Sequence, residues 1–238
     1  MLFKTRIKLS YELYSIMFML YNLLAFNTVF FEKVAAVGMG NSFNAGTFIV
    51  IWTLGSLACL LLFWPLTVKP LSCLFLLINS SVFYFIKTYN VSIDEEMLIN
   101  ALQTNKEETF DLLNWTWALY VLVLGVVPSL VVWKIDFAPV RFWKRRFEVM
   151  QILLLFLAPA IANLKVVAPF VRSNKPLKYQ LVPVNYIGAI ISYIKHHRKK
   201  PDFMTIADDA VFTKYWDNDK PNLIIFVVGE TARAANFG

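Results

Sequence analysis

The residues best suited to chemistry are a glutamate and a threonine near the end of the printed sequence. Glu230 and Thr231 follow Gly229 and the six-residue apolar run Leu223–Val228. An uninterrupted run of β-branched, Leu and Phe residues between Pro and Gly predicts a strand buried on both faces. Such strands belong to α/β sheets, where reacting groups lie beyond the carboxyl ends of the strands. We therefore expect a metal ligand or a reactive hydroxyl at this turn.

A second group of candidates lies in the acidic segment 90–114. The spacing of its apolar residues and a capping box that begins at Ser92 predict a helix. Asn100, Thr104 and Glu108 recur at every fourth residue, which places an amide, a hydroxyl and a carboxylate on one helical face. This stripe could bind a polar headgroup, with the carboxylate suited to an ammonium group, or it could be a solvated surface.

A third candidate is the amphipathic stretch 184–200, which ends in the basic sequence KHHRKK. One helical face of this stretch carries Ile187, Ile190, Ile191 and Ile194. A helix with an apolar face and a cationic end suits a membrane surface, because its charges then lie near lipid phosphates. His196 and His197 are about 100° apart on a helix, so we expect solvated side chains and no shared metal ion.

Membrane spans must position these groups. Hydrophobic residues form 58% of the 238 residues, compared with about 45–50% in soluble domains. Several stretches without charge have approximately the length that a helix needs to cross a bilayer. They predict five spans, at Leu13–Phe31, Gly46–Leu66, Pro70–Ile86, Leu112–Trp133 and Val149–Leu164. Gly38 and Gly40 predict an outer loop before the second span.

The distribution of basic residues predicts the orientation. On one side, the short segments that flank the spans contain Lys4, Arg6, Lys8, Lys69, Lys134, Arg141, Lys144, Arg145 and Arg146. The opposite loops contain Lys33, Lys87 and Lys106. Because positive residues next to spans stay in the cytoplasm, we expect a cytoplasmic N-terminus and a C-terminal part on the outer side.

The net charge, the cysteines and the uncharged centres of the spans limit the possible classes of protein. The net charge of +7 is divided between the two sides of the membrane, so no nucleic-acid partner is expected. Cys59 and Cys73 fall within predicted spans, where we expect free thiols. No Asp, Glu, Lys or Arg lies at the centre of a predicted span. This pattern disfavours a transporter, because such charges usually mark ion or proton pathways.

These features together resemble a known family. The chain is similar to the inner-membrane lipid A phosphoethanolamine transferases in four features. These are the five spans, the segment TYNVSIDEEMLINALQTNKEET after the third span, the basic amphipathic stretch and the final PNLIIFVVGETARAANFG. That group includes the mobile colistin-resistance enzymes. The resemblance covers nearly the whole chain, and its specific part is the VVGETAR string. It implies a five-helix membrane domain and a periplasmic catalytic domain of the alkaline-phosphatase and sulfatase type. Such an enzyme moves phosphoethanolamine from phosphatidylethanolamine to a phosphate of lipid A.

The resemblance also implies roles for individual residues. Glu230 matches the glutamate that ligates the catalytic zinc, and the other zinc ligands have no match here. Thr231 does not match the nucleophile, and we expect it to cap the following helix. The family's nucleophilic threonine comes from a later Thr-rich segment, so we expect it beyond Gly238. Asn100, Thr104 and Glu108 match positions that line the phosphatidylethanolamine pocket.

We therefore predict an all-α membrane protein followed by the first strand of an α/β catalytic domain. The five-span domain covers 1–170 and includes the outer helical loop 90–114, a periplasmic bridging segment covers 171–220, and the catalytic domain starts in 221–238. The location is a Gram-negative inner membrane, and the partners are phosphatidylethanolamine, lipid A and membrane lipids. A protein that ends at Gly238 would lack the nucleophile and is expected to be inactive. Two alternatives remain, a sulfatase-like transferase of the lipoteichoic acid synthase type and a non-enzymatic lipid-binding helical bundle.

Overall fold

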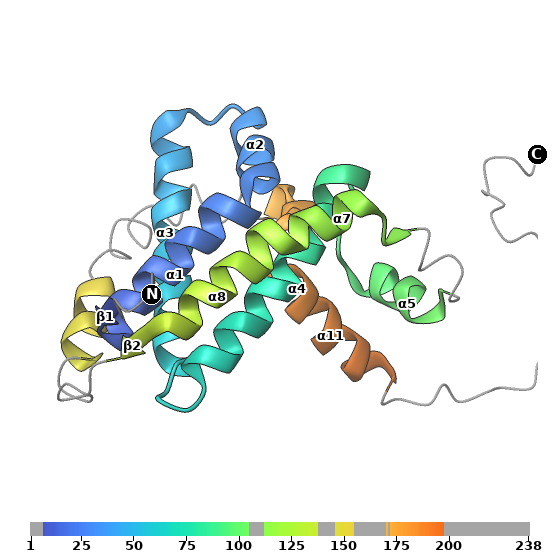
Figure 1. Ribbon diagram of the computed structural model, residues 1–238. Coiled ribbons are helices and arrows are strands. Elements are labelled where there is room, and N and C mark those ends of the chain that lie inside the picture. The colour runs from blue at the N-terminus through green and yellow to red at the C-terminus, as the bar shows by residue number, and fades with distance from the viewer. Residues whose placement is uncertain (1–6, 105–111, 138–145, 155–169, 171, 198–238) are drawn as a thin grey trace, which may run out of the picture. The chain divides into compact units, whose positions relative to one another are not determined.

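The structure is a computed structural model that describes residues 7–104, 112–137, 146–154, 170 and 172–197. All of them belong to one compact unit, Met1–Lys199, which is mainly helical (Figure 1). Its elements are β1 (Ile7–Leu9), α1 (Tyr11–Phe26), α2 (Thr28–Ala36), α3 (Asn41–Leu62), α4 (Val68–Tyr89), α5 (Glu95–Gln103), α7 (Trp115–Tyr120), the π-helix η1 (Val121–Val126), α8 (Val127–Lys134), β2 (Ile135–Phe137), the 3-10 helix η2 (Lys175–Gln180) and α11 (Val184–His197).

Three helical segments in this part of the chain are long and apolar enough to cross a membrane. They are α3, α4 and the continuous segment Trp115–Lys134, which comprises α7, η1 and α8. The bent pair of α1 and α2 is a fourth candidate. These elements correspond to the first four predicted spans. The fifth prediction, Val149–Leu164, lies mostly outside the described residues, of which 146–154 are helical.

The first span is not the single helix that its hydropathy predicts. α1 and α2 meet at Asn27, where the helix axis turns by 67°. Asn27 has φ −120° and ψ 19°, outside the helical region, and its side chain makes no helix cap. Its amide instead bonds to Val182, 155 residues further along the chain. A break that depends on so distant a partner leaves no local signal in the sequence.

The predicted limits of the second span are wrong at both ends. α3 begins at Asn41, so Gly46 lies inside the helix, and it ends at Leu62 rather than at Leu66. A turn closes its C-terminal end, because the Thr67 hydroxyl donates to the Leu62 carbonyl at 2.8 Å and accepts from the Trp64 N–H at 2.9 Å.

A loop between the first two spans is confirmed, and so is the state of the cysteines; that the loop lies on the outer side stays a prediction. Gly38 and Gly40 in this loop both have positive φ. Cys59 and Cys73 are free thiols, as predicted.

Arg146 caps the C-terminal end of α3 from the helical segment 146–154. Its guanidinium is 7% exposed and donates to the carbonyls of Leu60 and Phe63, the latter at 2.7 Å. It also lies over the Trp64 ring, 5.6 Å from the centroid. A cation at this position is favourable because the carbonyls at the end of a helix have no partner within the helix and form its negative pole.

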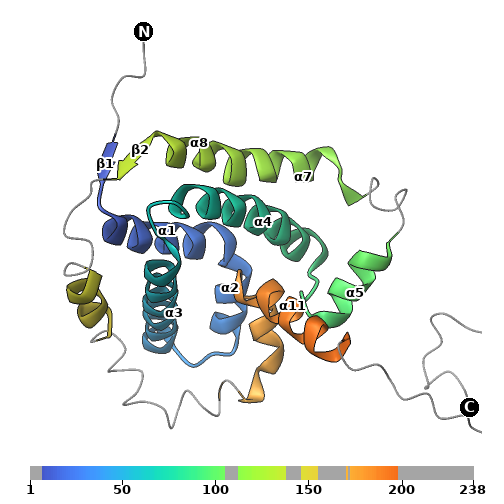
Figure 2. The same ribbon diagram turned by 90° about the horizontal axis from the view of Figure 1, so that it is seen from below.

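α4 lies between α1 and the α7–η1–α8 segment and packs against both (Figure 2). α1 also packs against α3, and β1 pairs with β2 in parallel, with Ile7 opposite Ile135. The core between these helices is aromatic and aliphatic, with Tyr14, Phe18, Phe26, Phe63, Leu76 and Phe83 buried. Outward positions such as Leu61, Leu74 and Leu130 are more than half exposed. Apolar residues on the outer surface are what a bundle in contact with lipid requires.

The close approach of η1 to α4 depends on Gly125. A Cβ atom at this position would lie 2.6 Å from Ser80 Oγ and 3.3 Å from the Leu76 carbonyl oxygen. Small residues allow helix backbones to approach closely in membranes. We expect Gly125→Val to destabilise the protein by about 1–3 kcal/mol, the usual cost of overpacking. Thermal unfolding in detergent would show this as a lower midpoint. Gly46→Val is the control, because a Cβ at Gly46 meets nothing within 4 Å. Equal midpoints for the two variants would contradict the expectation.

Candidate functional site

α5 confirms the helix expected in segment 90–114, but it starts differently from the prediction. The cap is Asp94, whose Oδ1 accepts the Met97 N–H at 2.9 Å. The capping box predicted at Ser92 is therefore wrong, and the Ser92 hydroxyl instead accepts from Gln180 Nε2 at 3.3 Å. A carboxylate at the first position of a helix accepts a free N–H and also interacts favourably with the helix dipole.

The helix ends before the predicted stripe of binding residues is complete. α5 stops at Gln103, and Thr104 follows with a non-helical ψ of 131°. The Thr104 hydroxyl donates to the Asn100 carbonyl at 2.7 Å, so the structure brings these two predicted site residues together. Glu108 lies outside the described residues. The Thr104 N–H donates to the same Asn100 carbonyl at 2.9 Å, so Thr104 lies at the C-terminal end of α5 and not within a longer helix.

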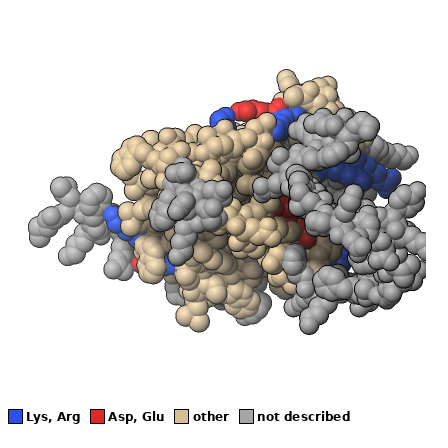
Figure 3. All heavy atoms as spheres, turned by 90° about the vertical axis from the view of Figure 1, so that its right-hand side faces the viewer, with Lys and Arg blue, Asp and Glu red and all other residues tan. Residues whose placement is uncertain are grey.

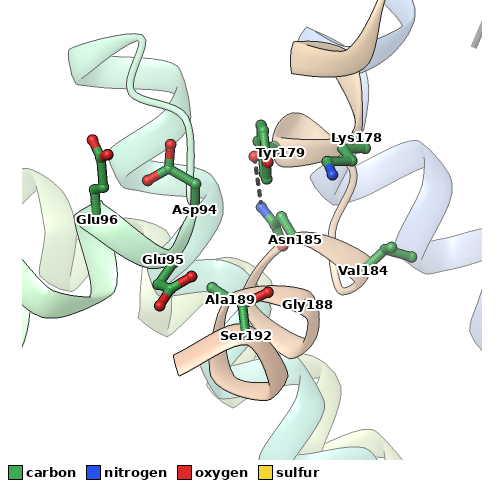
Figure 4. Close-up of a pocket in the computed structure, with 10 residues that line it drawn as sticks. All are labelled: Asp94, Glu95, Glu96, Lys178, Tyr179, Val184, Asn185, Gly188, Ala189 and Ser192. Atoms are coloured by element: carbon green, nitrogen blue, oxygen red, sulfur yellow. Dashed lines mark hydrogen bonds between the residues drawn. The ribbon is translucent and has the colours of Figure 1, made fainter. Parts of the chain in front are cut away.

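A cavity of about 350 Å³ lies between α5, η2 and α11 (Figure 4). It is lined by Asp94, Glu95 and Glu96 at the start of α5, by Lys178 and Tyr179 of η2, and by Val184, Asn185, Gly188, Ala189 and Ser192 of α11. We refer to this cavity as the α5–α11 cleft. Three carboxylates, one ammonium group, two hydroxyls and an amide belong to the residues that surround it. This set of groups suits a small polar ligand that carries both charges.

Hydrogen bonds to the Tyr179 backbone carbonyl join the walls of the cleft. The Ile93 N–H, just before α5, donates to the Tyr179 carbonyl at 3.1 Å. The same carbonyl accepts from Asn185 Nδ2 at 3.3 Å, and Asn185 is 2% exposed. η2 is thus bonded both to the segment before α5 and to α11, which fixes the base of the cleft.

A side-chain contact also joins α11 to the start of α5. His196 Nδ1 lies 2.8 Å from both carboxylate oxygens of Glu95. Figure 4 shows the Glu95 side chain directed from α5 toward α11. The His196 side chain is 62% exposed, as expected for a solvated histidine, and the contact with Glu95 is an addition that the sequence did not predict. An exposed pair of this kind contributes at most about 1 kcal/mol, so it orients α5 more than it stabilises the fold.

α11 is the amphipathic helix that the sequence predicts. Ala189 and Asn185 are buried on one side. The other side exposes Val184, Ile187, Ile190, Ile191 and Ile194. Figure 3 views the molecule from the side of α5 and α11 and shows a described surface that is mostly uncharged, with acidic and basic residues in small groups.

The predicted metal ligand and the predicted position of the nucleophile stay predictions. Glu230, Thr231 and Gly238 lie outside the described residues, so the structure does not test whether Glu230 binds zinc or whether the nucleophilic threonine follows Gly238. Among the residues that the structure describes, no group of three or more His, Cys, Asp or Glu side chains could hold a metal ion.

Sequence reasoning missed most of the α5–α11 cleft. The Asp-Glu-Glu triplet at the start of α5 was visible as an acidic cluster. Lys178, which lines the same cleft, and His196, which contacts Glu95, could not be recognised, because they are about 80 and 100 positions away in the sequence.

The fold and the cleft define an integral membrane protein with a polar site beside its helical bundle. The family model described as phosphoethanolamine transferase EptA/EptB matches residues 51–198, which is more than half of the chain. The chain belongs to this family. Both walls of the cleft lie within the matched region.

Individual relatives agree with this assignment. Phosphatidylethanolamine transferase Mcr-1 of Escherichia coli is 39% identical over 175 residues, which cover 70% of this chain and 32% of Mcr-1. Mcr-2 of the same organism is 34% identical over 223 residues, which cover 87% of this chain and 41% of Mcr-2. The solved structure of the integral membrane protein lipooligosaccharide phosphoethanolamine transferase A from Neisseria meningitidis is 28% identical, with a TM-score of 0.73. That match covers 80% of this chain and 37% of the meningococcal chain. The matched part of this chain therefore spans 32–41% of the length of these curated relatives.

Proposed function

We propose that this chain is the N-terminal part of an enzyme that transfers phosphoethanolamine from phosphatidylethanolamine to lipid A. Residues 1–170 would form the membrane domain, 171–220 the bridging segment and 221–238 the first strand of the catalytic domain. The observation that carries the proposal is the family match over 51–198, which includes α4, α5 and α11. Identities of 34–39% to Mcr-1 and Mcr-2 support the same donor lipid.

The donor's ammonium group would lie near the C-terminal end of α5. Asn100 and Thr104 are adjacent there. The last carbonyls of a helix form its negative pole, which favours a cation. The Glu108 carboxylate, a few residues further along the chain, would pair with the ammonium group and add a charge-assisted hydrogen bond.

Catalysis would take place in the domain that begins with the Leu223–Val228 strand. Glu230 has the carboxylate chemistry of a zinc ligand and would hold the metal together with residues outside this chain. When bound, zinc would lower the pKa of the attacking hydroxyl and make it a better nucleophile. A threonine of the catalytic domain, beyond Gly238, would attack the donor phosphate, release diacylglycerol and then pass phosphoethanolamine to lipid A.

The proposed location is the inner membrane, with the N-terminus in the cytoplasm and α11 on the periplasmic surface. The exposed isoleucines of α11 would lie in the outer leaflet, because burying apolar side chains in lipid is favourable. We expect a spin label at Ile191, which is 62% exposed, to be more accessible to oxygen than to a water-soluble nickel complex. A label at Lys175, an exposed charged residue of η2, should show the opposite preference. The measurement is electron paramagnetic resonance in nanodiscs, with Cys59 and Cys73 replaced. The same preference at both positions would contradict this placement.

The proposed reaction can be tested in vesicles. The intact enzyme is incubated with lipid A and with either phosphatidylethanolamine labelled in its ethanolamine or phosphatidylglycerol labelled in its glycerol. Label from ethanolamine should appear on lipid A. Transfer of glycerol phosphate would instead support the lipoteichoic acid synthase type. Lipid binding without any transfer would support the non-enzymatic alternative.

A further inference from the structure

Three asparagines are buried inside the bundle, and all of them make hydrogen bonds. Asn22 lies in α1, Asn27 at the break between α1 and α2, and Asn79 in the middle of α4. Their exposed fractions are 2%, 1% and 0%. Buried amides are stable in a membrane protein only when each polar group has a partner, because lipid supplies none.

Asn27 holds the segment before α11 by two bonds. Its Oδ1 accepts the Val182 N–H at 2.8 Å, and its Nδ2 donates to the Val182 carbonyl at 3.0 Å. The side-chain amide thus bonds to both backbone groups of Val182, as a neighbouring β-strand would. Val182 itself lies in an irregular segment. Nδ2 also donates to the Asn22 carbonyl at 3.1 Å, which joins this contact to α1.

A second contact reaches from α11 itself into the bundle. The Tyr186 hydroxyl donates to Asn79 Oδ1 at 2.9 Å, and Asn79 Nδ2 donates to Asn22 Oδ1 at 2.6 Å. Asn22 Nδ2 completes the series by donating to the Phe18 carbonyl at 2.7 Å. Burial raises the pKa of Tyr186 above its ordinary value, so the hydroxyl stays protonated and remains a donor.

The Asn27–Val182 contact and the Asn79–Tyr186 contact would be lost together. If the segment 182–186 left the bundle, Asn27 would lose both Val182 partners and Asn79 would lose its donor. Each loss would leave a buried polar group unsatisfied, which is costly. α11 has buried residues at Asn185 and Ala189 that form part of the cleft wall, so its position determines the shape of the cleft.

We propose that Asn27, Asn79 and Tyr186 are positioning residues that dock α11 on the membrane bundle and preform the α5–α11 cleft. The bundle itself would then set the position of α11 before any donor lipid binds. The part of this inference that concerns donor use rests on the function proposed above. The docking of α11 does not depend on it.

Hydrogen exchange tests the docking directly. We expect Asn27→Ala and Tyr186→Phe to raise the amide exchange of residues 184–197 by about tenfold, because local opening needs fewer bonds to break. Exchange in α3 and the middle of α8 should stay unchanged. Asn41→Ala is the matched control, since Asn41 is an exposed asparagine at the start of α3. Unchanged exchange in α11, or a uniform increase over all helices, would overturn the proposal.

Enzyme kinetics test the consequence for donor use. The docked α11 packs against α5 and forms the cleft with it, and the donor's ammonium group would lie at the C-terminal end of the same α5. In the intact enzyme, Tyr186→Phe should therefore raise the KM for phosphatidylethanolamine about tenfold and lower kcat much less, because a loosened α5 binds the donor less well. An equal KM in the variant and the parent would overturn the claim that docking of α11 preforms the cleft and the position of α5. A parent enzyme without any transfer would contradict the proposed function instead, and the exchange pattern would still decide whether α11 is docked.

Discussion

Replacing Glu230 by alanine in the intact enzyme is expected to reduce phosphoethanolamine transfer to background. Glu230 follows Gly229 after the predicted strand Leu223–Val228, a position at which a carboxylate can ligate zinc at about 2.0–2.2 Å. The variant loses an anionic ligand, so both the affinity for the metal and the activation of the nucleophile should fall. The measurements are transfer to lipid A and zinc content of the purified protein.

Thr231→Ala provides the matched control for this result. If Thr231 caps the helix that follows, the variant should lose about 0.5–2 kcal/mol of stability and keep its zinc and its activity. Normal turnover and normal zinc content in Glu230→Ala would show that the ligand has been misassigned. Loss of activity in Thr231→Ala without loss of stability would show that the threonine takes part in the reaction.

Glu108→Gln is expected to lower the use of phosphatidylethanolamine by roughly ten- to a hundredfold. The substitution keeps the shape of the side chain and removes the charge that would pair with the donor's ammonium group. Hydrogen bonds to charged groups contribute about 1.5–3 kcal/mol, which corresponds to that range of rates. The assay is transfer from a fluorescent phosphatidylethanolamine by the intact enzyme.

Glu107→Gln is the control for Glu108→Gln, because it removes the same charge from the neighbouring residue. We expect it to be nearly neutral. Equal losses at the two positions would mean that the general acidity of the segment matters rather than one carboxylate. No loss at Glu108 would remove it from the donor site.

The membrane helices could be predicted from sequence because their signal is local. Runs without charge near the length of a bilayer crossing locate α3, α4 and the segment Trp115–Lys134 to within a few residues. The 67° break at Asn27 could not be predicted, since it depends on bonds to Val182. The early end of α3 depends on the Thr67 hydroxyl and on Arg146, and hydropathy is insensitive to both.

The site was less predictable than the helices. The sequence predicts a helix in segment 90–114 correctly, but α5 ends at Gln103, so Thr104 does not continue the helical stripe that begins at Asn100. It does not show that Asp94 rather than Ser92 caps the helix, because both residues are good caps and the choice depends on the contact of Ser92 with Gln180. The Glu95–His196 pair joins segments about a hundred residues apart. Such a contact is a property of the packed helices and not of either segment alone.

The central claim is that this chain belongs to an enzyme that adds phosphoethanolamine to lipid A. The most direct test is mass spectrometry of lipid A from Gram-negative cells that produce the intact enzyme, compared with cells that produce its Glu230→Ala variant. Cells with the intact enzyme should contain a lipid A species heavier by one phosphoethanolamine group, and cells with the variant should lack it. Unmodified lipid A in both, with the intact enzyme present in the inner membrane, would contradict the claim.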